Sequence, residues 1–220
     1  MDILDFIKNN LNHVLPILIS GALGIAIIVE RVVSLYESYP IRDVEGFFNK
    51  ISSLVMSGKI QEATKFCDKY SRKPLAKVVK SGLMRAHMPE TVIEDGLQIA
   101  VNDATQAILK RTSFLATIAN VATLLGLLGT IAGLIHSFEA VGHADAQQKS
   151  ALLSAGIATA MNATMMGLGV AIPCMVAFSV LVNKSNRLIA EIDSSSVKVM
   201  DILKQRFYSA EHLQNERESS

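Results

Sequence analysis

The sequence predicts an all-α membrane protein with three transmembrane helices, the second and third of which extend into a cytoplasmic helical region. Half of the 220 residues are hydrophobic, and they are concentrated in three long blocks. The second block, residues 112–138, and the third, residues 150–183, contain no Asp, Glu, Lys or Arg. Because about 20 apolar residues cross the hydrocarbon of a bilayer, both blocks are long enough to span it.

The first block predicts transmembrane helix 1 over residues 13–33. Its leading segment carries Asp2, Asp5 and one cation, Lys8, whereas the stronger positive charge follows the apolar run. A cleaved signal peptide has its positive charge before the apolar run. A retained span is therefore expected, with residues 1–12 as an external N-terminus.

The distribution of Lys and Arg predicts the orientation of the three spans. Of the 21 basic residues, 13 lie in residues 31–111 and six in residues 184–217, whereas the other segments hold Lys8 and Lys149. Positive charge gathers on the cytoplasmic side of membrane proteins. We therefore expect a periplasmic N-terminus, a cytoplasmic loop over 34–111, a short external loop over 139–149, and a cytoplasmic tail over 184–220.

The predicted cytoplasmic segments have helical periodicity. Apolar residues recur at helical spacing over 44–55, 60–70 and 74–83. Residues 97–125 contain no Gly or Pro, so one continuous helix is predicted from 89 to 138. The third span is expected to continue as a helix to about residue 208. The apolar stripes on these helices can pack on each other or on neighbouring copies of the chain.

Small residues gather on one helical face of each of the last two spans. The predicted face of the second span contains Gly126, Gly129, Thr130 and Gly133, and that of the third span contains Gly156, Ala160, Ala163 and Gly167, flanked by Thr159 and Thr164. One interpretation is tight helix packing, because small residues let helices approach closely. The other is a narrow shared lumen that accepts another helix, where threonine hydroxyls pass a proton or ligate a cation. Pro173, inside the third span, predicts a helix kink.

The sequence shows no pattern typical of an enzyme. It contains no phosphate-binding loop, metal-ligand spacing or nucleophile–base set, and Cys67 and Cys174 lie far apart in different settings. No dense basic patch with interleaved aromatic residues indicates a nucleic-acid partner. We therefore expect no catalytic residue, cofactor, metal site or nucleic-acid ligand.

Two of these segments resemble a known family. The stretch GLLGTIAGLIHSF (126–138) resembles the second-span signature, and AGIATAMNATMMGLGVAIP (155–173) the third-span signature, of the ExbB/TolQ-like branch of the MotA/TolQ/ExbB proton-channel family. The pair Glu30-Arg31, which closes the first span, also matches. The resemblance covers the order of the spans, the loop lengths and the topology, whereas the four-span layout of the MotA branch does not fit.

The resemblance implies a pore-forming stator subunit of an ion-driven motor in the bacterial inner membrane, energising an envelope process such as protein transport. In this family a homopentamer surrounds a dimer of a single-span ExbD/TolR-like partner with a membrane Asp, and the resemblance also suggests a TonB- or TolA-like protein as a further partner. The family's two pore-lining threonines correspond to Thr130 and Thr164. The family's usual third-span glutamate is replaced here by Thr159, which keeps Na+ open beside the favoured H+. The alternative is a structural or scaffolding membrane subunit without an ion path.

Overall fold

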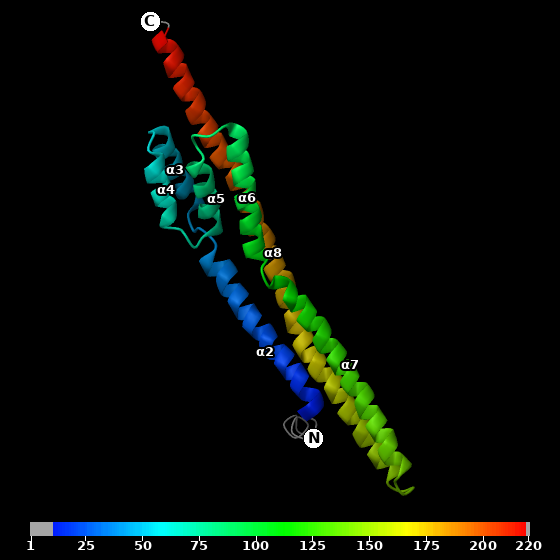
Figure 1. The fold of residues 1–220 in the computed structure, drawn as a ribbon. Coiled ribbons are helices and arrows are strands. Elements are labelled where there is room, and N and C mark those ends of the chain that lie inside the picture. The colour runs from blue at the N-terminus through cyan, green and yellow to red at the C-terminus, as the bar shows by residue number, and fades with distance from the viewer. Residues whose placement is uncertain (1–10, 219–220) are drawn as a thin grey trace. The chain divides into compact units, whose positions relative to one another are not determined.

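The protein is described by a computed structural model over residues 11–218, and within this range it consists of helices and their connections, without a strand (Figure 1). The elements in chain order are α2 (Leu11–Val33), the π-helix η1 (Ser34–Ser38), α3 (Val44–Met56), α4 (Ile60–Asp68), α5 (Pro74–Met84), α6 (Glu90–Leu109), α7 (Thr112–Gly142) and α8 (Lys149–Glu218). Three helical stretches are long and apolar enough to cross a membrane. The predicted all-α fold with three such helices is therefore confirmed, while most of the predicted N-terminal segment 1–12 lies outside the described residues.

The chain forms two compact units. Among the described residues, the spanning unit comprises those up to Arg31 together with Arg111–Leu181, and the loop-and-tail unit comprises Val32–Lys110 together with those from Val182 onward. The spanning unit thus contains most of α2, all of α7 and the first part of α8. The loop-and-tail unit contains α3 to α6 and the last part of α8.

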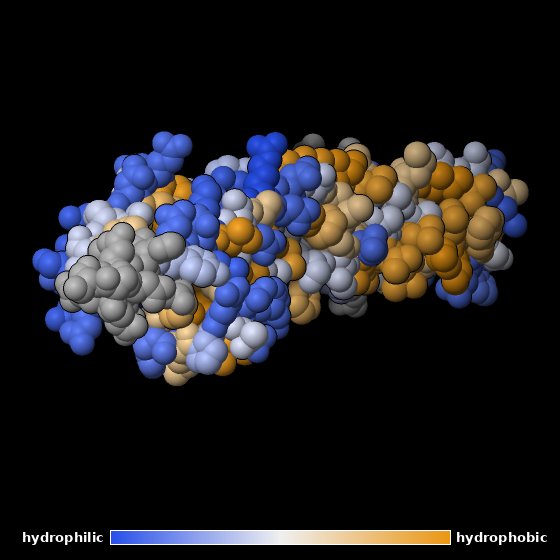
Figure 2. Space-filling model, turned by 90° about the horizontal axis from the view of Figure 1, so that it is seen from above, coloured by the Kyte–Doolittle hydropathy of each residue, from blue (hydrophilic) through white to orange (hydrophobic). Residues whose placement is uncertain are grey.

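In the spanning unit, α2 packs through a single stripe. Val14, Ile17 and Ser20 are buried at helical spacing, followed by Gly24 and Arg31. The opposite side exposes large apolar side chains, among them Ile25 at 65%. The space-filling view shows broad hydrophobic areas on the surface (Figure 2). Apolar surface of this extent is what a lipid-facing helix presents.

The loop-and-tail unit is built from helices with local start and stop signals. The Asp43 side chain accepts a hydrogen bond from the Gly46 N–H at 2.8 Å and so caps the start of α3. Gly58, which follows the end of α3, has a φ of +76°, a conformation that favours glycine. Pro74 occupies the first turn of α5, where its missing N–H is harmless. Helices α3, α4 and α5 thus follow the predicted stretches closely.

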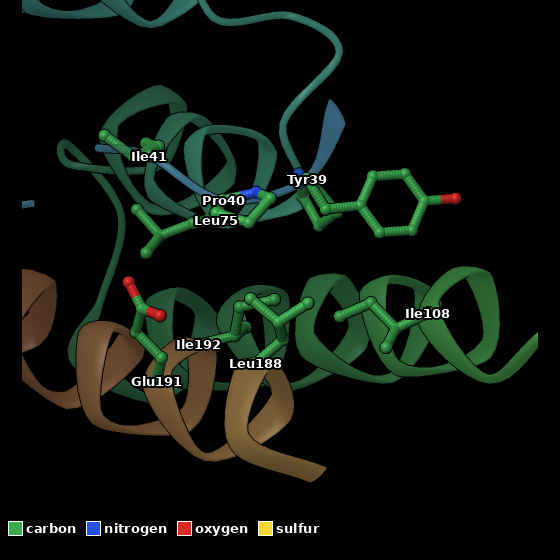
Figure 3. Close-up of a pocket in the computed structure, with 9 residues that line it drawn as sticks. Tyr39, Pro40, Ile41, Leu75, Ile108, Leu188, Glu191 and Ile192 are labelled. Atoms are coloured by element: carbon green, nitrogen blue, oxygen red, sulfur yellow. The ribbon is translucent and has the colours of Figure 1, made fainter. Parts of the chain in front are cut away.

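The core of this unit contains a cluster of aromatic rings. Phe47 stacks on Phe66 at a ring distance of 5.6 Å and meets Tyr70 edge-on at 5.4 Å. Elsewhere in the unit, a small pocket of about 10 Å³ lies among Tyr39, Pro40, Ile41, Pro74, Leu75, Ile108, Leu188, Glu191 and Ile192 (Figure 3). Such a volume holds about one water molecule, so the α2–α3 connection is packed closely against α5, α6 and α8.

The predicted continuous helix over 89–138 is wrong, because the chain breaks between α6 and α7. Lys110 leaves the helical region with a ψ of 130°, and Arg111 adopts a left-handed φ of 62°. A non-glycine residue in this conformation costs about 1–2 kcal/mol. The Arg111 guanidinium donates to the Glu30 carboxylate at 2.7 Å, and this half-exposed contact from α2 offsets part of that cost. By contrast, the predicted continuation of the third span is confirmed, since α8 is helical to Glu218 with Pro173 inside it.

Candidate ion-path site

Two threonine hydroxyls face each other between α7 and α8. The hydroxyls of Thr130 and Thr164 are hydrogen-bonded to each other, and both side chains are half-buried. Thr130 Oγ1 also lies 3.2 Å from the carbonyl oxygens of Gly126 and Ala160, and Thr164 Oγ1 lies 3.3 Å from that of Gly126. The structure therefore brings together the two threonines that the sequence singled out.

These four oxygens share two protons. Each hydroxyl donates one hydrogen bond and accepts up to two, whereas the carbonyl oxygens only accept. Either threonine can donate to the other while its partner donates to a carbonyl, so the same geometry allows more than one arrangement of the protons. A hydroxyl pair of this kind can receive a proton on one side and release one on the other.

The close approach of α7 and α8 depends on their small residues. A Cβ added at Gly126 would lie 3.2 Å from the Ala163 carbonyl oxygen, and one added at Gly167 would lie 2.6 Å from that of Ala122. At Gly129 an added Cβ would meet the Ala163 methyl at 2.7 Å, and at Gly133 it would meet Ala160 at 3.2 Å. The backbones of the two helices are thus nearly in contact along a seam, and this contact is why the hydroxyls meet. The seam is formed by Gly126, Gly129 and Gly133 of α7 and by Ala160, Ala163 and Gly167 of α8.

The seam allows the two interpretations of the small residues, tight helix packing and a shared lumen, to be compared with the structure. Five of the small residues are buried against the other helix of the same chain, as the tight-packing interpretation expects: Gly126, Gly129, Ala160, Ala163 and Gly167. Gly133 and Gly156 are half-buried at its edge. A lumen shared by several copies is a property of an assembly, so the lumen-facing role of these residues stays a prediction.

Thr159 is not part of the hydroxyl pair. Its Oγ1 donates to the Ala155 carbonyl oxygen of its own helix at 3.0 Å, and its side chain is half-buried. Gly156 lies about one turn before Ala160 in α8. Because it has no side chain, the Ser137 side chain of α7 fits into the space beside it. The structure thus separates Thr159 from Thr130 and Thr164 while keeping it on the same part of α8.

Two glycines of α2, Gly21 and Gly24, also lie close to neighbouring helices, and they are not among the small residues that the sequence indicates for the second and third spans. An added Cβ would lie 2.7 Å from Cys174 Sγ at Gly24 and 3.1 Å from the Val170 side chain at Gly21. Ile28 packs on the same small cluster of α7 and α8. The spacing of the two glycines on the face of Ile17 and Ser20 was the available signal that α2 packs closely here.

The only carboxylate of α2 within its described residues, Glu30, lies at the helix end and not beside the threonines. It accepts from Arg111 at 2.7 Å and lies 3.4 Å from Arg31, whose side chain is 3% exposed. The motif Glu30-Arg31 is therefore part of an ion cluster that joins the end of α2 to the start of α7. Residues 112–138 and 150–183, which contain the threonines, carry no charged side chain.

The chain is similar to known membrane proteins. Residues 70–194 match the model of a family described as the MotA/TolQ/ExbB proton channel family. A Tol-Pal system protein TolQ from Haemophilus influenzae is 35% identical over 103 residues, covering 46% of this chain and 45% of the relative. A putative biopolymer transport protein ExbB-like 2 from Helicobacter pylori is 40% identical over 87 residues, covering 40% and 57%. A putative ExbB homolog from Methanothermobacter thermautotrophicus is 28% identical over 144 residues, covering 65% and 49%. The chain spans about half the length of the curated relatives it matches.

Proposed function

The chain belongs to the MotA/TolQ/ExbB proton channel family and is a multi-pass inner-membrane protein, and we propose that it is the pore-forming stator subunit of an ion-driven motor. The observation that carries the proposal is the hydrogen-bonded hydroxyl pair of Thr130 and Thr164, half-buried in a seam without charge. The pair supplies groups that relay a proton. The transported ion in this proposal is H+, with Na+ as the alternative.

The proposal requires a partner. The second and third spans hold no carboxylate, so the acid that takes up and releases the ion comes from elsewhere. In the proposed assembly five copies of the chain surround a dimer of an ExbD/TolR-like protein that supplies a membrane Asp. The N-terminus is periplasmic, the C-terminus is cytoplasmic, and a TonB- or TolA-like protein receives the work.

Within this assembly the small residues have two roles. The half-buried residues of the seam and its neighbourhood, namely Thr130, Gly133, Gly156, Thr159 and Thr164, line the path beside the partner helices. The buried residues, namely Gly126, Gly129, Ala160, Ala163 and Gly167, hold α7 and α8 close enough for the hydroxyls to meet. Pro173 marks the proposed bend of α8 beyond them.

Threonine substitutions in the complete complex test this proposal. The chain is reconstituted with its single-span partner in liposomes, and proton uptake is followed with an entrapped pH-sensitive dye. Thr130→Val and Thr164→Val remove a hydroxyl at nearly constant volume, and uptake should fall by about a hundredfold, the size of contribution that positioned proton-transfer groups make. Thr130→Ser and Thr164→Ser keep the hydroxyl and should keep most of the uptake.

Thr117→Val is the matched control, because Thr117 is an exposed threonine of the same helix. Its uptake should equal that of the unchanged complex. The native mass of every variant complex is recorded alongside, so that lost assembly is not mistaken for lost transport. Full proton uptake by both valine variants in intact complexes would exclude the hydroxyl pair from the ion path.

The second candidate function is a structural or scaffolding membrane subunit. The burial of five small residues between two helices of one chain favours it, because packing alone accounts for them. It predicts that no complex with a single-span Asp-bearing protein forms and that the chain has the native mass of a monomer or dimer. A mass of five copies plus two of the partner would exclude it.

A further inference from the structure

An open groove lies in the loop-and-tail unit where the start of α4, the turn between α5 and α6, and α8 meet. Its volume is about 990 Å³. It is lined by Gly58, Lys59, Ile60, Gln61, Glu62, Thr64, Lys65, Leu83, Met84, Ala86, His87, Met88, Leu203, Arg206 and Phe207. A smaller hollow of about 160 Å³ adjoins it and shares Ala86, Met88, Leu203 and Phe207. The two form one surface feature, called here the tail groove.

The floor of the tail groove is apolar. Leu83 and Leu203 are buried at its base, with 1% and 6% of their surfaces exposed. Around them Met84, Met88 and Phe207 remain 59%, 41% and 68% exposed. Clustered large apolar side chains on a surface indicate a binding site, and methionine side chains adapt readily to the shape of a partner.

The rim of the tail groove is basic. Lys59, Lys65 and Arg206 line the larger part, where Glu62 is the one acidic residue. Glu62 lies 3.3 Å from Lys59 Nζ, so that pair is neutral as a unit and Lys65 and Arg206 leave an excess of positive charge. In the smaller hollow Glu90 is 2.5 Å from Lys204 Nζ, which likewise neutralises the acid there.

We propose that the tail groove binds an acidic amphipathic helix of a protein on the same side of the membrane. The apolar face of that helix packs on Met84, Met88 and Phe207, and Asp or Glu residues beside this face pair with Lys65 and Arg206. A helix is the fitting form because the described part of the chain offers no strand edge to complete an extended peptide's hydrogen bonds, whereas a helix satisfies its own backbone. The proposal does not depend on the ion path.

Binding of a designed peptide to the full chain tests this assignment. The chain is placed in nanodiscs of phosphatidylcholine, and fluorescence anisotropy is measured with a labelled peptide of about 16 residues, long enough to form a helix, with Leu on one face and Glu on the other. A twin peptide with Lys in place of Glu has the same apolar face. The acidic peptide should bind at least about tenfold more tightly than its twin, because the rim charges attract only the former.

Matched variants locate the binding. The double change Lys65→Glu and Arg206→Glu should weaken the acidic peptide by about tenfold or more, whereas Lys77→Glu, an exposed lysine of α5 outside the groove, should leave it unchanged. Phe207→Ser should weaken both peptides, and Val197→Ser, at a residue of α8 that is 69% exposed and outside the groove, should not. Circular dichroism checks that each variant keeps its helices.

Three results would overturn the proposal. Equal affinity for the two peptides would exclude a charge-selective site, and an equal loss with Lys77→Glu would place the binding elsewhere. If Phe207→Cys instead gives disulfide-linked dimers of this chain and no peptide binds, the groove belongs to a second copy.

Discussion

The seam between α7 and α8 makes Gly167 the sharpest single test of how the spanning unit is held together. In Gly167→Ala the new Cβ would lie 2.6 Å from the Ala122 carbonyl oxygen and 2.9 Å from the Gly126 Cα. Ordinary contact begins at 3.4 Å, so the atoms overlap by about 0.8 Å. Both neighbours are backbone atoms and cannot rotate away, so the helices must separate. Overpacking of this kind costs about 1–3 kcal/mol.

Gly169→Ala provides the control, because an added Cβ there meets nothing within 4 Å. Both substitutions gain the same helix propensity, about 1 kcal/mol over glycine. Their difference therefore isolates the seam, and Gly167→Ala should have a free energy of unfolding about 1–3 kcal/mol below that of Gly169→Ala.

The assay is a titration of the protein in dodecyl maltoside with SDS, followed by the loss of helical circular dichroism. The Gly169→Ala protein should unfold at the same SDS fraction as the unchanged protein or a higher one, and the Gly167→Ala protein at a lower one. Coincident transitions for the two alanine variants would refute the reasoning, because they would mean that α7 and α8 do not approach at this point.

The remaining predictions concern the loop-and-tail unit. Gly58→Ala should lower the free energy of unfolding by about 1–2 kcal/mol, since Gly58 has a positive φ although its surroundings are open; an unchanged chemical denaturation midpoint would contradict this. Asp43→Ala should cost about 1 kcal/mol through the lost cap of α3, and Asp43→Asn, whose side chain still accepts the Gly46 N–H, should cost much less in the same measurement. Burial raises the pKa of the Cys67 thiol to about 12 from an ordinary 9.0, so iodoacetamide at pH 8 should modify Cys67 in unfolded but not in folded protein, as read by mass spectrometry. The same shift adds stability that is fully present below pH 9 and is lost as the pH rises toward 12; Cys67→Ala should therefore flatten the fall of the unfolding free energy over that range.

The local elements of this fold could be predicted because their signals are local. Asp43, Gly58 and Pro74 mark helix ends within a few residues of the backbone groups they serve, so α3, α4 and α5 are readable from short windows. The break before α7 has no such signal. Lys110 and Arg111 are good helix formers, and the contact that stabilises the break comes from Glu30, 81 residues earlier in the chain.

The two threonines of the hydroxyl pair could be singled out from the sequence, but their arrangement and the separation of Thr159 from them could not. A helical wheel places Thr130 and Thr164 beside small residues on their own helices, yet it does not say which surface each face meets. In the structure the two faces meet each other, because Gly126 and Gly167 allow backbone contact. The packing of α2 was missed for a related reason, since Gly21 and Gly24 form only a short small-residue face.

The ion pair between Glu30 and Arg111 has a consequence for the order of events during synthesis. Glu30 leaves the ribosome 81 residues before Arg111. At about 5–20 residues per second, the carboxylate waits roughly 4–16 s for its distant partner. During that interval Arg31 is the adjacent counter-charge of Glu30, and the residues of α3 to α6 are made. The start of α7 can be fixed only when Arg111 emerges, so the break that precedes it is set late, after the helices of the preceding loop have had time to form.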